Sequence, residues 1–195
     1  MGKGRLEAFS DGVIAIIITI MVLEMHAPAG HDLQSLKAML PVFGQYVISF
    51  VYVGIYWSNH HHMLHAVKSI NGSALWANLH LLFWLSMVPF ASAWMSENHS
   101  HDTWPVAFYG IILLMNAIAY TILALTLIKH EGKHSILAEA FGRDIKGKLS
   151  IAFYCCAIPL CWVNPLISFG LYILVALIWL VPDKRIENKI VHPHE

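Results

Sequence analysis

A group of histidines in the stretch YWSNHHHMLH, Tyr56 to His65, is the densest set of side chains that could bind a metal ion or a proton. His61 and His65 are four residues apart, which places both imidazoles on one face of a helix, a spacing found in zinc sites. The stretch lacks an HExxH pattern and a carboxylate pair that would complete a ligand set. Three interpretations therefore stay open: a structural hydrogen-bonding network, a pH sensor and a metal site.

Polar side chains also stand at the beginning of a long apolar run, RLEAFSDGVIAIIITIMVLEM, residues 5–25. A lone charge in a bilayer is costly, so Arg5, Ser10 and Asp11 need partners. A helix turns by about 100° per residue, which puts Arg5 and Asp11 on different faces and prevents them from neutralising each other along one helix. We therefore expect their partners on neighbouring helices or subunits.

The histidine stretch supplies candidate partners at the same predicted membrane depth. We expect the indole N–H of Trp57 and an imidazole of His60 or His61 to bond the Asp11 carboxylate or the Ser10 hydroxyl. Two other polar residues, His80 and Asn116, stand alone in apolar segments, and we predict that each forms a hydrogen bond between helices.

One face of the first predicted helix is mainly aliphatic. Helical periodicity places these residues on a single stripe: Arg5, Phe9, Gly12, Ile16, Thr19, Ile20 and Leu23. Such a stripe packs in a helical bundle, or it lines a hydrophobic constriction when several copies surround an axis. Periodicity by itself leaves both interpretations open.

The composition is that of a membrane protein. Of 195 residues, 57% are hydrophobic and 12% are charged, whereas a soluble domain carries about a quarter charged residues. A span needs about 20 mostly apolar residues, and we predict an all-α integral membrane protein with one domain over residues 1–195. The six predicted spans are approximately 6–25, 37–59, 73–95, 105–128, 149–164 and 166–182. The last two are joined by the turn WVNP, Trp162 to Pro165, as a tight helical hairpin.

The distribution of basic residues predicts the orientation. Eleven of the twelve Lys and Arg residues fall in the N-terminus, the even-numbered loops and the C-terminal tail, which all lie on one side, and Lys37 is the exception. Basic loops stay in the cytoplasm, so we predict that both termini are cytoplasmic. The formal net charge is zero, which gives no basic field for nucleic acid. An enzyme would need a nucleophile with a base, or a carboxylate pair, and the sequence shows neither arrangement. We therefore do not predict an enzyme.

The stretch RLEAFSD, Arg5 to Asp11, resembles the RxxxFSD signature of the transmembrane protein 175 family of potassium channels. The similarity continues through GVIAIIITIMVLEM (Gly12 to Met25), YWSNHH (Tyr56 to His61) and LLFWLSMVPFASAWM (Leu81 to Met95). The last three predicted spans resemble the family mainly in hydropathy.

The resemblance implies a potassium-selective channel without a TVGYG filter, in which potassium is the permeant ion and no cofactor is needed. It assigns the pore constriction to Ile16, Ile20 and Leu23, and a selectivity role to the Thr19 hydroxyl. It also implies that the signature residues Arg5, Phe9, Ser10 and Asp11 tie the first helix to Trp57 and to His60 or His61. Animal members carry two six-helix units, so a single unit implies a prokaryotic homotetramer in the plasma membrane. The alternatives are a secondary transporter and a membrane-embedded, His-ligated metalloprotein.

Overall fold

The structure is a computed structural model that describes residues 2–96, 102–132, 134–141 and 144–180. Within these ranges the regular structure is entirely α-helical, as predicted. The helices in chain order are α1 (Lys3–Leu23), α2 (Leu33–Ala38), α3 (Leu40–His65), α4 (Gly72–Ser86), α5 (Val88–Ser96), α6 (Thr103–Glu131), α7 (Ile136–Phe141), α8 (Ile145–Leu160) and α9 (Pro165–Leu180).

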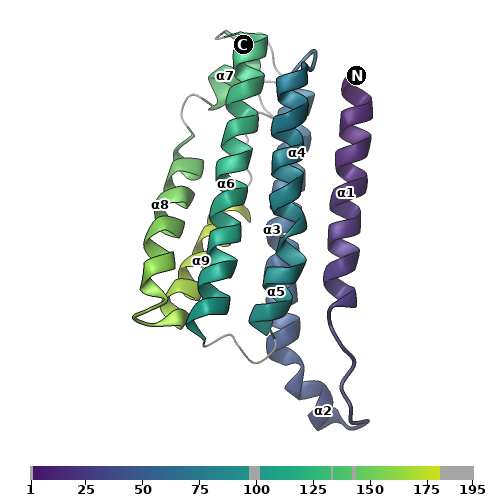
Figure 1. Ribbon diagram of the computed structural model, residues 1–195, viewed down its shortest axis with the longest axis vertical. Coiled ribbons are helices and arrows are strands. Elements are labelled where there is room, and N and C mark those ends of the chain that lie inside the picture. Colours follow the sequence, from purple (N-terminus) through teal and green to yellow (C-terminus); the bar gives the residue numbers. More distant parts are fainter. Residues whose placement is uncertain (1, 97–101, 133, 142–143, 181–195) are drawn as a thin grey trace.

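The long helices stand side by side as a bundle (Figure 1). Helix α1 lies at one edge and packs on α3, α4 and α5, while α8 and α9 lie on the other side of α6. We call the end at which α1 begins, at the top of Figure 1, the amino end. There the ammonium group of Lys3 donates a hydrogen bond to the His65 carbonyl oxygen, at 3.3 Å, which joins the start of α1 to the end of α3.

Four helical stretches in the described chain are long and apolar enough to cross a membrane: Lys3–Leu23, Leu40–His65, Gly72–Ser96 and Thr103–Glu131. The third stretch combines α4 and α5. Helices α8 and α9 correspond to the fifth and sixth predicted spans, but each has 16 residues, fewer than the roughly 20 that a span needs. The protein is thus an all-helical membrane protein, and a six-span topology stays a prediction.

The second predicted span, 37–59, differs from the structure at both ends. Helix α2 ends at Ala38 and α3 begins at Leu40, because Pro41 has no backbone N–H to continue the hydrogen bonds of α2 but fits in the first turn of a new helix. Helix α3 then continues to His65, so the whole histidine stretch is helical. Residues 181–182 of the last predicted span lie outside the described residues.

The N-terminus of α2 is capped by Asp32, whose carboxylate accepts hydrogen bonds from the Ser35 hydroxyl and the Ser35 backbone N–H, at 2.5 and 2.8 Å. The Ser35 hydroxyl, followed by the backbone N–H, stabilises the charged carboxylate and lowers the pKa of Asp32 below its ordinary value.

The predicted helical hairpin at Trp162–Pro165 is confirmed. Helix α8 ends at Leu160 and α9 begins at Pro165, and the Asn164 side chain accepts a hydrogen bond from the Leu166 backbone N–H at 2.9 Å. The hairpin docks on α6 through Tyr172, which packs directly over Gly110. A Cβ atom at Gly110 would lie 2.0 Å from the Tyr172 hydroxyl oxygen, so only glycine allows this approach.

Candidate pore-lining helix and its polar anchor

Helix α1 buries one face against the rest of its own chain. Its buried residues recur at intervals of three or four, as one stripe of a helix: Leu6, Ser10, Ile14, Ile17 and Met21. This face contacts α3, α4 and α5. The aliphatic members attach the helix by packing, and Ser10 introduces a polar group that needs a hydrogen-bond partner.

The aliphatic stripe noted in the sequence lies on the opposite, exposed face. Leu23 is 77% exposed, Ile16 58%, Phe9 47% and Ile20 40%. Thr19 is also exposed, and its hydroxyl donates a hydrogen bond to the Ile16 carbonyl oxygen at 2.8 Å. No helix in the described part of the same chain covers this stripe. Its residues do not contribute to the core of a single chain.

A chain of hydrogen bonds anchors the buried face near the amino end. The Ser10 hydroxyl donates to the Leu6 carbonyl oxygen at 2.8 Å and accepts from the side-chain amide of Asn78 at 2.9 Å. The other end of that amide, Asn78 Oδ1, lies 2.7 Å from Nε2 of His60. Since the oxygen can only accept, His60 carries a hydrogen on Nε2 in this arrangement.

Burial explains why these contacts matter. Ser10 and Asn78 are fully buried and His60 is 1% exposed, so water cannot replace a lost partner. The three side chains come from α1, α4 and α3, and the bonds therefore fix the position of α1 relative to both other helices. The expected direct bond from His60 or His61 to Ser10 or Asp11 is not formed, because Asn78 lies between His60 and Ser10.

Asn78 is a member of this hydrogen-bond chain that the sequence analysis did not single out. Its signal was available: it is an amide side chain inside an apolar segment, as is Asn116. Helix α4 begins at the amino end, which brings Asn78 to the depth of Ser10.

A second contact joins α1 to α3 at the protein surface. The indole N–H of Trp57 donates to the Asp11 carboxylate at 2.9 Å. The Trp57 ring stacks on His61 at 6.2 Å between centroids, and His61 stacks on His65 at 6.0 Å. Trp57, His61 and His65 thus form an exposed ladder of rings along α3.

Arg5 and Phe9 are placed apart from these hydrogen bonds. Arg5 is exposed, and its guanidinium forms no hydrogen bond or ion pair within the described ranges.

The structure gives no support to the interpretation of the histidine stretch as a metal site. Among the described residues, no three His, Cys, Asp or Glu side chains are grouped so that they could hold a metal ion. His61 and His65 remain a pair.

His80 and Asn116 were both predicted to form hydrogen bonds between helices, and the prediction is correct only for Asn116. His80 accepts a hydrogen bond from the Trp84 indole N–H at 2.9 Å, within α4 rather than between helices. Asn116 of α6 does bond between helices, since its amide donates to the Trp84 carbonyl oxygen at 3.3 Å. The side-chain amide oxygen of Asn116, Oδ1, is buried without a hydrogen-bond partner in the described chain.

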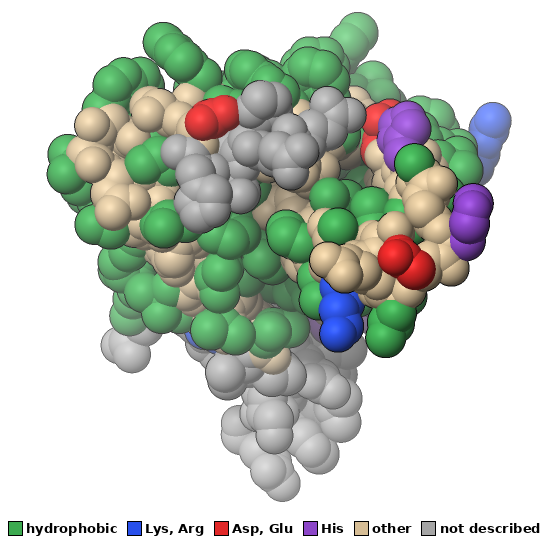
Figure 2. All heavy atoms as spheres, turned by 90° about the horizontal axis from the view of Figure 1, so that it is seen from below, with side chains coloured by type: hydrophobic (Ala, Val, Ile, Leu, Met, Phe, Trp, Pro, Cys, Tyr) green, Lys and Arg blue, Asp and Glu red, His purple; other side chains and the backbone are tan. Residues whose placement is uncertain are grey.

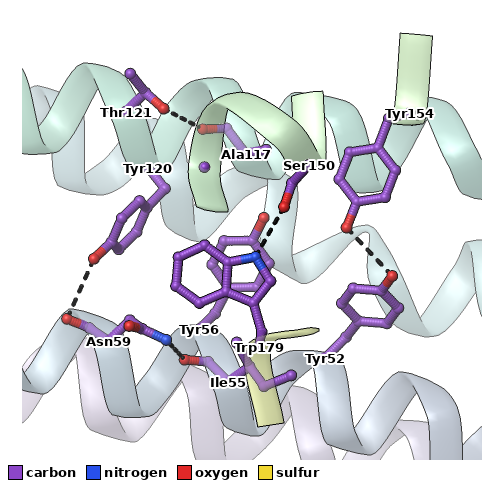
Figure 3. Close-up of a pocket in the computed structure, with 11 residues that line it drawn as sticks. Tyr52, Ile55, Tyr56, Asn59, Ala117, Tyr120, Thr121, Ser150, Tyr154 and Trp179 are labelled. Carbon is purple, nitrogen blue, oxygen red and sulfur yellow. Dashed lines mark hydrogen bonds between the residues drawn. The ribbon is translucent and has the colours of Figure 1, made fainter. Parts of the chain in front are cut away.

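A cavity inside the bundle lies away from α1, between α3, α6, α8 and α9 (Figure 3). Figure 3 shows Trp179 across it, with its indole N–H donating to the Ser150 hydroxyl at 2.8 Å. To the right of Trp179 in this view, the Tyr154 hydroxyl donates to that of Tyr52 at 3.3 Å. The cavity has a volume of about 30 Å³, whereas one water molecule needs roughly 10–15 Å³ of such volume, so the cavity has room for about two water molecules. It is too small to conduct a hydrated ion through one chain.

Comparison with known proteins places this geometry in a family. The sequence model described as endosomal/lysosomal potassium channel TMEM175 matches residues 5–89. A potassium channel of Chryseobacterium sp. (strain P1-3) is 57% identical over 190 residues, which cover 97% of this chain and 98% of the relative. The chain belongs to the TMEM175 family of potassium channels.

A more distant relative in the TMEM175 family agrees in fold, and the human member matches in part of its sequence. The crystal structure of a lysosomal potassium-selective channel TMEM175 homologue from Chamaesiphon minutus superposes with a TM-score of 0.80 at 28% identity, over 92% of this chain and 96% of that one. The human endosomal/lysosomal proton channel TMEM175 is 35% identical over 96 residues, 43% of this chain and 19% of the human protein.

The segment shared with the TMEM175 model contains the whole polar anchor. Residues 5–89 include α1, α3 and α4, and therefore Ser10, Asn78, His60 and the Trp57–Asp11 pair. The TMEM175 family consists of ion channels and not of enzymes, in agreement with the sequence analysis.

Proposed function

We propose that four copies of the chain form a homotetramer and that K⁺ moves down its electrochemical gradient through a pore lined by α1. The observation that carries the proposal is the uncovered stripe of α1 in a member of a potassium-channel family. The stripe includes Arg5, Gly12 and Thr19, polar or small residues that a purely lipid-facing surface does not require. A stripe that faces an axis shared by several copies accounts for them.

The two flanks of the stripe differ in size, which supports a ring of α1 helices. One flank exposes the small side chains Ala8 and Ala15, with Val22 on the same side nearer the end of the helix. The other flank carries Val13 beside the large stripe residues Phe9 and Ile20. Large side chains of one α1 fit against the small flank of the next, and small residues let helices approach closely in membranes. This head-to-tail contact is heterologous, and it closes into a ring of four when each copy is rotated by about 90° from the last.

Charge supports the same arrangement. Arg5 has no side-chain hydrogen bond or ion pair within the described chain, and Asp11 uses its Oδ1 atom for Trp57. In the ring, the Arg5 guanidinium of one copy pairs with Asp11 of the next. Such a pair provides the partner that a charge near the hydrocarbon core needs.

The stripe also has the chemistry of a selective constriction. Rings of Ile16, Ile20 and Leu23 narrow the pore with apolar surface, and such constrictions gate by dewetting. The Thr19 hydroxyl gives its hydrogen to the Ile16 carbonyl oxygen, which leaves its lone pairs for a cation or the hydration shell of a cation. Thr19 therefore contributes to the preference for K⁺ in this proposal.

In the membrane, the amino end faces the cytoplasm and α8 and α9 serve as the fifth and sixth spans. Lys3, Lys68, Lys129, Lys146 and Lys148 lie at this end, as the positive-inside rule requires. Conduction needs no cofactor. A prokaryotic plasma membrane is the expected location, since the Chryseobacterium relative covers the same length.

The test is electrical recording of the purified protein in lipid bilayers under a K⁺/Na⁺ bi-ionic gradient. We expect a current without ATP whose reversal potential favours K⁺, together with a tetrameric mass in native mass spectrometry. Flux strictly coupled to a proton gradient would identify a secondary transporter instead. A stable, conducting monomer would refute the shared axis.

A further inference from the structure

Three tryptophans from separate segments meet at the end of the bundle opposite the amino end. They are Trp94 of α5, Trp104 in the first turn of α6 and Trp162 in the turn between α8 and α9. They line an open cavity of about 460 Å³ together with Asp102, Thr103 and Pro105. We call this site the tryptophan corner. The α1 stripe and its polar anchor contribute no residue to it.

Ring contacts hold the indoles in place. Trp104 and Trp162 meet edge to face, with centroids 5.3 Å apart and planes at 82°. Trp94 packs on Phe108 of α6 in the same manner, at 5.6 Å and 61°. Because each ring is fixed by a neighbour, the site is formed before a ligand binds, which reduces the entropy that binding costs.

The three tryptophans stay exposed to different degrees in spite of these contacts. Trp104 is 66% exposed, Trp162 57% and Trp94 37%. Single tryptophans at a membrane interface are ordinary anchors in the headgroup region. Here, however, three indoles gather at one corner of the bundle instead of spreading around it. A gathered set with a shared cavity indicates a binding site.

The chemistry of the corner favours a cation. The face of an indole ring carries negative electrostatic potential, and aromatic cages of this kind recognise quaternary ammonium groups. The Asp102 carboxylate adds a negative charge to the cavity wall. Among the described residues at this end, Lys37 is the one Lys or Arg, whereas Glu24, Asp32 and Asp102 are acidic. Figure 2 views this end, where hydrophobic side chains cover most of the described surface.

The surroundings of the corner indicate that the cation belongs to a lipid. The turn and the first residues of α9 beside Trp162 expose apolar side chains, with Val163 77%, Leu166 49% and Ile167 50% exposed. Acyl chains would cover this surface while a headgroup occupies the cavity. A free ammonium ion would leave it bare.

We propose that the tryptophan corner binds the alkylammonium headgroup of a zwitterionic phospholipid in the leaflet at this end. The headgroup links the start of α6 to the α8–α9 hairpin and to α5, so the bound lipid stabilises the packing of these elements. The site is independent of the pore, and its failure would leave the proposed K⁺ conduction unaffected.

The experiment measures thermal unfolding of the full-length protein in maltoside micelles with added short-chain phosphatidylcholine or phosphatidylglycerol of equal chain length. We expect phosphatidylcholine to raise the melting temperature and phosphatidylglycerol to have a smaller effect, because a ligand that binds the folded state stabilises it. This comparison needs only the unaltered protein. Equal shifts with both lipids would overturn the proposal.

Variants then localise the effect. Trp104→Leu and Trp162→Leu should each weaken the binding of phosphatidylcholine on the order of fivefold, the loss expected for one cation–π contact. Trp76→Leu is the matched control, since Trp76 is 75% exposed near the start of α4 at the other end. An unchanged phosphatidylcholine effect in both corner variants would refute the site.

Tetramethylammonium chloride separates the lipid from a soluble cation. We expect it to compete with phosphatidylcholine only weakly, because it lacks the acyl chains that cover the apolar surface. Binding of tetramethylammonium that requires Trp104 and is as tight as that of the lipid would overturn the lipid assignment.

Discussion

The indole N–H of Trp57 donates a hydrogen bond to the Asp11 carboxylate at 2.9 Å and joins α1 to α3 at the surface of the bundle. In the proposed tetramer this carboxylate lies beside the neighbouring α1. One residue pair therefore serves both the attachment of α1 to its own chain and the orientation of its exposed stripe.

Removing the indole donor should loosen α1. In Trp57→Phe an aromatic ring is kept but Asp11 loses its hydrogen bond. We expect a loss of about 1 kcal/mol in stability, less than the roughly 1.5–3 kcal/mol of a bond to a charged group, because this bond is exposed to water. Thermal unfolding in micelles measures the change. Trp76→Phe, an exposed tryptophan whose indole forms no hydrogen bond within the described chain, is the control and should have little effect.

Removing the central amide of the polar anchor should be more damaging. Asn78→Ala leaves the Ser10 hydroxyl and the His60 imidazole buried with fewer partners, and each such group costs roughly 1–3 kcal/mol. We expect lower yield and a lower melting temperature. Leu79→Ala, at the next and 40% exposed position of α4, provides the comparison. If both variants were equally stable, the hydrogen-bond chain would have no anchoring role.

The constriction can be tested by changing its apolar surface. Leu23→Ala widens the predicted ring and Ile16→Asn wets it, so both should raise the current through the pore. Leu125→Ala on α6, where the side chain is 54% exposed, is the control for a position outside the stripe. Currents that are the same in all three variants and the unaltered protein would show that α1 does not line the pore.

Thr19→Val tests the hydroxyl contribution to selectivity at nearly constant side-chain volume. We expect the K⁺/Na⁺ permeability ratio to fall while the protein stays folded. Thr126→Val is the control, because the hydroxyl of the half-buried Thr126 donates to the Ile122 carbonyl oxygen at 2.7 Å, much as Thr19 does to Ile16. A ratio that falls equally in both variants would point to a general effect on helix stability.

Gly110→Ala tests the docking of the terminal hairpin. The new methyl group would lie 2.0 Å from the Tyr172 hydroxyl oxygen and 2.6 Å from the ring carbon that bears it, so α9 must shift. Overpacking of this kind costs roughly 1–3 kcal/mol, and adding Tyr172→Phe should recover part of it. Gly170→Ala on α9 has open space around the added atom and should be tolerated. Faster hydrogen exchange in α8 and α9 would locate the effect.

The sequence by itself determined the class of protein, the approximate position of α1 (predicted 6–25, found as Lys3–Leu23) and the helical hairpin at Trp162–Pro165. These features depend on local properties: long apolar runs, basic flanks, and a turn sequence with Asn164 and Pro165. The stripe of Ile16, Thr19 and Leu23 was also visible, because helical periodicity is fixed once the segment is a helix.

Only the tertiary structure decided which face of α1 the chain buries, and that Asn78 stands between Ser10 and His60. Ser10 and Asn78 are 68 positions apart in the chain, and their contact depends on how α1, α3 and α4 pack. Hydropathy gives the depth of a residue in the membrane but not its rotation about a helix or its neighbour on another helix. For the same reason, the meeting of Trp94, Trp104 and Trp162 follows from the folded bundle, since no local pattern relates three residues on separate elements.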